Sequence, residues 1–207
     1  MHAHSARDSH SASDSHSAPD SRNAPDSPSA SAAPDARAGA GSHASPPPRA
    51  RPAVDSHATL AHWMGPLDAN GAGSVHGGTV MKLCDEAAGL AAVKHCRQRV
   101  VTASVDRMNF MVPIHVGELV TFQASVNAAW RTSMEVGVRV DTENPRTGER
   151  RHSNSAYLTM VAVGDDGHPT AVPPLLVQSD DERRRESEAQ LRRRNRLAER
   201  QQILAGR

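Results

Sequence analysis

The stretch HGGTVMKLCDEAAGLAAVKHC, residues 76–96, decides the fold. Its apolar residues recur at intervals of three and four, which is the periodicity of a helix with one buried face. They are Val80, Leu83, Cys84, Ala87, Leu90 and Ala91. Small residues between Ala87 and Ala92 would let such a helix lie close to a sheet. We therefore predict a central helix over Thr79–Cys96.

Four segments after this helix alternate apolar and polar residues, as strands with one buried face do. They are Val100–Phe110, Leu119–Trp130, Ser133–Thr142 and Ser153–Val163. The apolar side of the last segment is read as Tyr157, Thr159, Val161 and Val163. Before the helix, Thr59–Trp63 is only a short apolar-leaning segment, and a loop rich in glycine follows it. One long helix followed by antiparallel strands predicts an α+β domain.

The first quarter of the chain has a different composition. Residues 1–57 contain no Trp, Tyr, Phe, Ile or Leu, and the pair Asp-Ser recurs every six residues between positions 8 and 31. Such a segment cannot build a core, so we predict a disordered low-complexity tail over residues 1–57 and a folded domain over residues 58–178. Six of the twelve histidines lie in this tail. They are scattered, and we expect no metal site.

The last segment, residues 179–207, is predicted to form a charged helix. Ser179 to Glu182 has the pattern of a capping box, and Arg184–Glu188 and Glu188–Arg192 have the spacing of ion pairs on one helix face. Two arginine triplets, 183–185 and 192–194, could contact phosphate. A solvated helix is the interpretation that we favour.

Composition and charge exclude several kinds of partner. The formal net charge is +1, which does not fit a nucleic-acid-binding domain with a dominant positive face. No apolar run has the length that a membrane-spanning helix needs, and the N-terminus has no apolar stretch typical of a signal peptide. Cys84 and Cys96 would lie about 18 Å apart on one helix, too far for a disulfide. Two free cysteines favour the cytoplasm.

The candidate chemistry gathers at the start of the central helix. Backbone N–H groups of Gly77 and Gly78 would stand free at a helix N-terminus, where they can stabilise an oxyanion. Asp85 is an acid in the most apolar helix of the chain, whereas Glu86 points about 100° away and forms no dyad with it. Without further information, a tight turn and a solvent-facing Asp85 remain the alternatives.

The order of these residues resembles a known family. Asn70-Gly71, Val75 to Gly78 and Asp85 to Ala87 are similar to the active-site region of hotdog-fold acyl-CoA thioesterases. Further matches are at residues 101–106, 109–110, 113–114, 117–118, 133–136 and 172–174. The likeness is to the bacterial short single-domain enzymes and the mammalian cytosolic brain-type hydrolase, and it covers about Leu60 to Glu188. It implies a curved antiparallel sheet wrapped around one long helix, paired into homodimers and further into a trimer of dimers.

The resemblance also implies roles for individual residues. Asn70 and Asp85 map onto the catalytic asparagine and aspartate, and we expect the substrate to be a fatty acyl-CoA. Gly77 and Asp85 are separated by a rise of about 12 Å along the helix, so one subunit cannot easily supply both groups to one site. We therefore expect Asn70, Gly77 and Gly78 of one subunit to face Asp85 of another.

The remaining expectations concern the mechanism and the rim of the site. Asp85 would activate water or attack the thioester directly, and His76 would support the loop. Candidates for coenzyme A binding are Arg107, Arg131 and Ser133, and no cofactor is expected beyond the coenzyme A of the substrate. A non-catalytic acyl-CoA sensor and a hotdog dehydratase or hydratase are the alternatives, although the loop at Asn70 offers no base for the latter.

Overall fold

The computed structural model describes residues 48–206. It contains seven strands, two short 3-10 helices (η1 and η2) and two α-helices within that range. In chain order these are β1 (Arg51–Pro52), η1 (Ala53–Ser56), β2 (Ala58–Trp63), η2 (Pro66–Asp68), α1 (Gly77–Cys96), β3 (Arg99–Val105), β4 (Leu119–Ala129), β5 (Ser133–Glu143), β6 (Arg150–Val163), β7 (Leu175–Leu176) and α2 (Asp180–Ala205). The repeat at residues 8–31 and most of the predicted tail lie outside the described residues.

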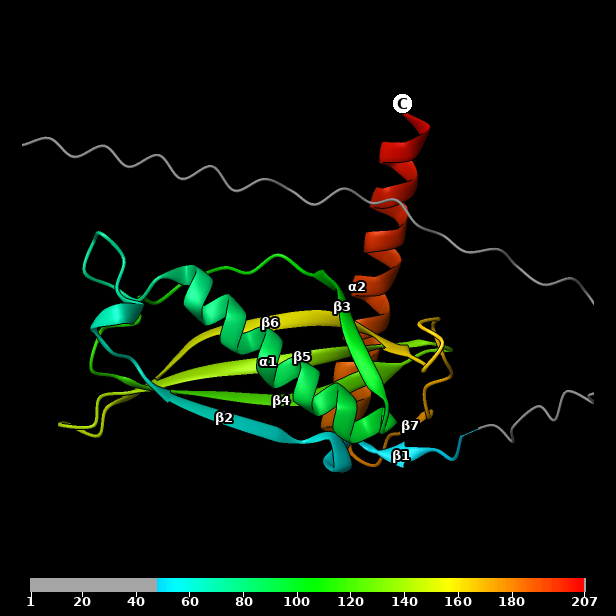
Figure 1. Cartoon of the computed structure of the whole chain (residues 1–207), viewed down its shortest axis with the longest axis horizontal. Coiled ribbons are helices and arrows are strands. Elements are labelled where there is room, and N and C mark those ends of the chain that lie inside the picture. The colour runs from blue at the N-terminus through cyan, green and yellow to red at the C-terminus, as the bar shows by residue number, and fades with distance from the viewer. Residues whose placement is uncertain (1–47, 207) are drawn as a thin grey trace, which may run out of the picture. The chain divides into compact units, whose positions relative to one another are not determined.

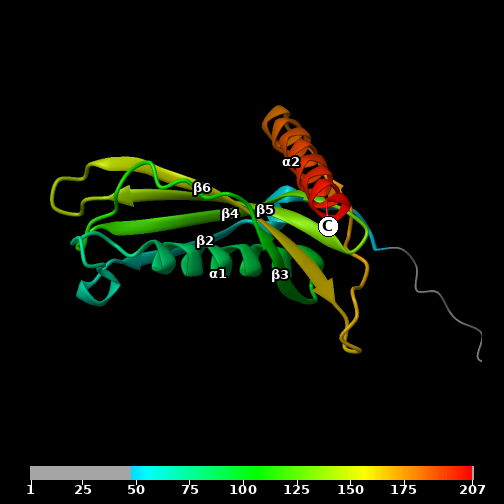
Figure 2. The same cartoon turned by 90° about the horizontal axis from the view of Figure 1, so that it is seen from above.

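The main sheet has five strands in the order β2-β4-β5-β6-β3, and all neighbours are antiparallel. It curls around α1, which lies across one of its faces, while α2 lies on the opposite face (Figures 1 and 2). Strands β1 and β7 form a separate parallel pair. This is the arrangement that the resemblance implied, and the predicted α+β fold is confirmed.

The core lies between α1 and the concave face of the sheet. On α1, Ala87, Ala88, Ala91 and Ala92 are fully buried, and their small side chains let the helix backbone approach the strands. The strands contribute larger side chains to the same layer: Val120, Phe122, Met134, Val136, Val138, Val140, Leu158 and Met160. Burying such side chains is the main favourable contribution to folding.

The structure corrects the sequence interpretation at its N-terminal boundary. Ala53 and Ser56 are buried, although they were assigned to the tail. The Ser56 hydroxyl donates to the carbonyl of Ala53 at 2.6 Å and accepts the N–H of Val126 at 2.9 Å. The folded unit therefore begins by Arg51, and a fifth strand, β2, occupies the segment from Ala58 to Trp63.

The residues of β6 that face the core also differ from the expected ones. The pattern of the sequence singled out Tyr157, Thr159 and Val161, but Leu158 and Met160 are the residues that face the core. Both faces of this strand are covered, one by α1 and the other in part by α2, so both faces carry large side chains. Strand β3 ends at Val105 rather than at Phe110.

Helix α2 begins as predicted but is not simply solvated. The Ser179 hydroxyl accepts the N–H of Glu182 at 3.2 Å, which confirms the cap. The second arginine triplet packs on the sheet: Arg192 lies over the ring of Tyr157 at 3.7 Å, and Arg193 lies over Trp130 at 4.3 Å. These contacts fix the middle of α2 to the convex face.

Both cysteines are free and buried, which gives a first testable expectation. Burial, reinforced by the neighbouring charge of Asp85, raises the pKa of Cys84 to about 12, and burial also raises the pKa of Cys96. Both thiols therefore stay protonated and shielded at pH 8. A thiol reagent such as DTNB should titrate neither cysteine in the native protein and both in urea. Rapid reaction of a native thiol would contradict this packing.

Candidate functional site

The loop before α1 is built around Asn70. Its side-chain Oδ1 accepts the N–H groups of Ala72 at 2.9 Å and Ser74 at 3.2 Å, while its Nδ2 donates to the carbonyl of Val75 at 3.5 Å. The side chain of an asparagine commonly closes a turn in this way. Asn70 is half-buried and is held by the backbone that it shapes.

Asp68 ties this loop to its neighbours. Its carboxylate accepts the N–H of Gly65 at 2.8 Å and lies 3.2 Å from Nε2 of His62 on β2. Its backbone carbonyl accepts the N–H of His76 at 2.7 Å. The bond from Gly65 holds the pKa of the Asp68 carboxyl below its ordinary value. One residue therefore joins β2, the η2 turn and the start of α1 on either side of Asn70.

His76 is the N-cap of α1. Its Nδ1 accepts the N–H of Gly78 at 2.9 Å. The Gly78 amide therefore already has a partner, whereas the sequence analysis expected it to be free. A Cβ at position 78 would lie 2.9 Å from that ring nitrogen, whereas a Cβ at Gly77 would only touch the ring of Phe110 at 3.4 Å. Glycine at position 78 thus lets the histidine cap the helix, and Gly77 supplies the first helical N–H.

Asp85 lies on α1 and faces β3. Its Oδ1 accepts a 2.5 Å hydrogen bond from the hydroxyl of Thr102, which also lies 3.6 Å from the sulfur of Met160. Asp85 is half-buried, in keeping with a carboxylate that has both a fixed partner and access to solvent. Thr102 was not singled out from the sequence as a site residue, and only this contact across seventeen residues reveals it.

Exposed apolar side chains occur on the two elements that carry Asp85 and Thr102. Met81, Leu90 and Val93 on α1 and Val101 and Val105 on β3 are each at least 40 % exposed. β3 is also an edge strand of the sheet. Exposed apolar side chains and an unpaired strand edge are typical of surfaces that pair with another protein chain.

The three candidates for coenzyme A binding are not gathered around Asp85. Arg107 is exposed in the loop after β3, 3.7 Å from Glu199 of α2. Arg131 and Ser133 lie at the turn between β4 and β5, where their carbonyls accept the N–H groups of Val172 and Trp130. Within residues 48–206, no group of three or more His, Cys, Asp and Glu side chains is placed to hold a metal ion. No helix of that range is long and apolar enough to cross a membrane.

Comparison with known proteins places this geometry in a family. The family model "Thioesterase superfamily" matches residues 72–149. The protein VdlD of Helicobacter pylori is 40% identical over 126 residues, which cover 61% of this chain and 72% of VdlD. The chain belongs to the thioesterase superfamily. A second relative in the superfamily, the cytosolic acyl coenzyme A thioester hydrolase of Rattus norvegicus, is 39% identical over 132 residues, 63% of this chain. That match spans only 35% of the rat protein's length.

Solved structures in the superfamily agree with the fold. A hexameric acyl-CoA thioesterase in its apo form is 38% identical, with a TM-score of 0.71, over 73% of this chain and 97% of its own. The acyl-CoA hydrolase of Staphylococcus aureus, in complex with butyryl coenzyme A and coenzyme A, is 32% identical, with a TM-score of 0.68. The match covers 75% of this chain and 96% of that hydrolase.

The Staphylococcus aureus hydrolase has also been solved with an aspartate, an asparagine or a threonine replaced by alanine. In that chain the asparagine precedes the aspartate by fifteen residues, and the threonine follows it by seventeen. Asn70, Asp85 and Thr102 have the same spacings in this thioesterase-superfamily chain.

Proposed function

We propose that the protein hydrolyses acyl-CoA thioesters to a free acid and coenzyme A. The observation that carries this proposal is the hydrogen bond from Thr102 to Asp85, which holds a half-buried carboxylate on the helix behind the Asn70 loop. The relatives named as acyl-CoA thioester hydrolases, and the shared spacing of three polar residues, support the same reaction.

In the proposed mechanism, Asp85 removes a proton from a water that attacks the thioester carbonyl, the C–S bond breaks, and the proton passes to the departing thiolate of coenzyme A. In the alternative route Asp85 attacks the carbonyl itself and expels coenzyme A, and water then hydrolyses the acyl-aspartyl anhydride to the free acid and restores the carboxylate. The Thr102 hydroxyl donates a hydrogen bond to Oδ1 of Asp85. Oδ2 is therefore the oxygen that takes the proton or attacks the carbonyl. The Gly77 amide stabilises the oxyanion at the positive end of α1, and Asn70 orients the carbonyl or the water. The Gly78 amide would contribute only after His76 releases it, which makes His76 a support of the loop rather than a base.

We further propose that the site is shared between two copies of the chain. Asn70 and Gly77 lie at the start of α1, and Asp85 lies a rise of about 12 Å further along the same helix. A second copy packed on the exposed apolar residues of α1 and β3 would bring its own loop to that carboxylate. A relative that is hexameric supports further assembly, for which we propose a trimer of dimers. The relatives' name supports a cytosolic location.

Turnover of a panel of acyl-CoAs, from short to long chains, tests this function. Release of free coenzyme A thiol should be catalytic with some members of the panel and should obey saturation kinetics. Binding of acyl-CoA without any thiol release would contradict hydrolysis and would favour a sensor. Conversion of the acyl chain with the thioester intact would instead indicate a hydratase.

Replacement of Thr102 tests how Asp85 is positioned. Thr102→Val removes the hydrogen bond to the carboxylate and keeps the shape of the side chain. A bond to a charged acceptor is strong enough that kcat should fall about tenfold or more, with KM nearly unchanged because the substrate does not depend on this hydroxyl. Thr102→Ser, which keeps the hydroxyl, should retain most of the rate. A Thr102→Val variant that keeps the wild-type kcat would contradict a role of the hydroxyl in positioning Asp85.

A further inference from the structure

The loop after β3, residues 106–113, carries large apolar side chains toward the start of α1 (Figure 1). Met108 packs against the core, whereas Phe110 is 46% exposed and Met111 is 79% exposed. None of the roles proposed above uses these side chains. The loop therefore places an aromatic ring that is still half accessible close to the proposed site.

The Phe110 ring covers Gly77. A Cβ added at Gly77 would lie 3.4 Å from Cζ and 3.5 Å from Cε2 of Phe110, and the three atoms nearest to it all belong to this ring. Gly77 is the residue whose N–H we propose as the oxyanion donor, and such a donor lies about 3 Å from the oxygen that it stabilises. The carbonyl of a bound thioester, and the first carbon of its acyl group, would therefore lie beside the tip of the Phe110 ring.

The far end of this loop is fixed to β6 and to the segment before α1. The carbonyl of Val112 accepts the Ser153 hydroxyl at 3.1 Å, and the carbonyl of Ile114 accepts the N–H of Val75 at 2.8 Å. Among residues 48–206, no backbone-to-backbone hydrogen bond involves residues 107–111. The position of the ring therefore depends on the two ends of the loop and on side-chain packing.

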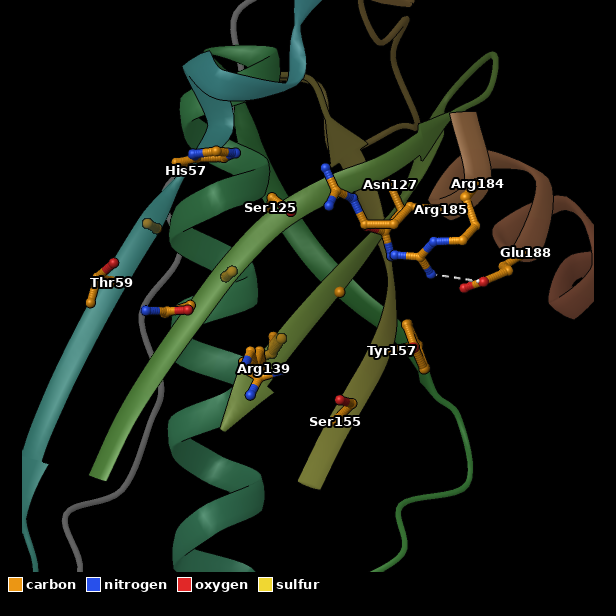
Figure 3. Close-up of a pocket in the computed structure, with 15 residues that line it drawn as sticks. His57, Thr59, Ser125, Asn127, Arg139, Ser155, Tyr157, Arg184, Arg185 and Glu188 are labelled. Atoms are coloured by element: carbon orange, nitrogen blue, oxygen red, sulfur yellow. Dashed lines mark hydrogen bonds and ion pairs between the residues drawn. The ribbon is translucent and has the colours of Figure 1, made fainter. Parts of the chain in front are cut away.

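The start of the loop is fixed by α2. Nη1 of Arg196 donates to both carboxylate oxygens of Asp106, at 2.9 and 2.7 Å, and the two side chains are 25% and 13% exposed. The N–H of Asp106 donates to the carbonyl of Tyr157 on β6 at 2.9 Å. Figure 3 shows the Tyr157 side chain on the face of the sheet that also carries Arg184 and Glu188 of α2. A helix on the convex face thus holds a loop that reaches the start of α1.

These contacts give Phe110 a place in substrate selection. We propose that Phe110 is a specificity-determining residue, whose ring limits the bulk of the acyl group next to the thioester carbonyl. An unbranched chain extends along the exposed part of the ring and gains apolar contact, whereas a branch on the carbon next to the carbonyl meets the ring. Asp106, paired with Arg196, is a positioning residue that keeps the ring against Gly77. The proposal rests on the proposed function and deepens it by naming the class of acyl group that the site favours.

Butyryl-CoA and isobutyryl-CoA test this role, because they are isomers that differ only by a branch next to the carbonyl. The measured quantity is kcat/KM for isobutyryl-CoA divided by kcat/KM for butyryl-CoA. Phe110→Ala should raise this ratio about tenfold or more, the effect that one methylene has in a closely fitting apolar pocket. Asp106→Asn keeps the shape of the side chain and weakens the pair with Arg196. It should raise the ratio by a smaller factor, whereas a purely structural loss would lower both rates together.

Met111→Ala is the matched control. Met111 is the neighbour of Phe110 in the same loop and is more exposed, and none of its atoms is among the three nearest to a Cβ at Gly77. This variant should keep the wild-type ratio. The proposal is overturned if Phe110→Ala leaves the ratio unchanged, or if Met111→Ala raises it by as much.

A binding measurement separates this proposal from the proposed function. If the wild type releases no thiol from either ester, the proposed function fails, and calorimetric titration with the same two esters then tests Phe110. Phe110→Ala should raise the affinity for isobutyryl-CoA relative to that for butyryl-CoA. Equal relative affinities in the wild type and in Phe110→Ala would overturn the role of the ring.

Discussion

Replacing Asp85 with alanine should lower kcat/KM for acyl-CoA about a thousandfold, the range that a positioned general base or nucleophile supplies. Thr102 holds the carboxylate of Asp85 at 2.5 Å, and no other acid of α1 is placed to substitute for it. The loss should lie in kcat, because the carboxylate acts on the reacting atoms rather than on the distant nucleotide of the substrate.

Glu86→Ala is the matched control for this prediction. Glu86 is the next residue of α1 and is exposed, and its carboxylate pairs with Lys82 one turn earlier. Its removal should leave kcat within about twofold of the wild-type value, since an exposed ion pair contributes little to the stability of the fold. Asp85→Ala that turns over substrate at the wild-type rate would contradict the assignment, provided that both variants melt at the same temperature as the wild type.

Replacing Arg192 with methionine should destabilise the protein by about 3 kcal/mol, because it leaves a fully buried carboxylate without its main partner. Glu135 has no exposed surface and accepts hydrogen bonds from two nitrogens of Arg192, the shorter at 2.6 Å. Arg196 approaches the same carboxylate only to 3.6 Å. The nonpolar chain of methionine fills much of the same space, so the effect reports the loss of the charge pairing together with the stacking of the guanidinium on Tyr157.

Urea unfolding at fixed protein concentration measures this effect, since assembly would otherwise shift the midpoint. Arg183→Met serves as the control, as it removes an exposed arginine of the same helix and should change the unfolding free energy by less than about 0.5 kcal/mol. The double variant Glu135→Gln with Arg192→Met should recover part of the loss, because the buried charge is then absent. A single Arg192→Met variant as stable as the wild type would show that α2 is held by other contacts.

The sequence predicted the elements whose pattern is local. The predicted ends of helix α1 and strands β4 and β5 lie within two residues of the observed ends, because each element buries one regular face against a large neighbouring surface. β2 was missed because the segment Ala58–Trp63 contains alanine, threonine and histidine, and it is a strand through its pairing with β4. The prediction of which β6 residues face the core was wrong, because α2 covers part of the other face and that face also carries large side chains.

The candidate site likewise contains residues that the local sequence pattern reveals and contacts that only the folded structure shows. Asn70, His76 and Asp85 stand out through their place at and within the central helix, and the resemblance to a family strengthened that interpretation. The bond from His76 to Gly78 and the bond from Thr102 to Asp85 depend on side-chain geometry that spacing does not reveal. The contact of Phe110 with Gly77 likewise joins the loop after β3 to a helix start that is distant from it in the sequence.

The most direct test of the account is complementation between two inactive variants. Asn70→Ala and Asp85→Ala chains should each be nearly inactive alone. When they are produced together in equal amounts, half of the dimers contain one chain of each kind, and each mixed dimer holds one intact shared site and one doubly damaged site. The mixture should therefore recover about a quarter of the wild-type rate. A mixed assembly that is no more active than either variant alone would contradict a site shared between subunits.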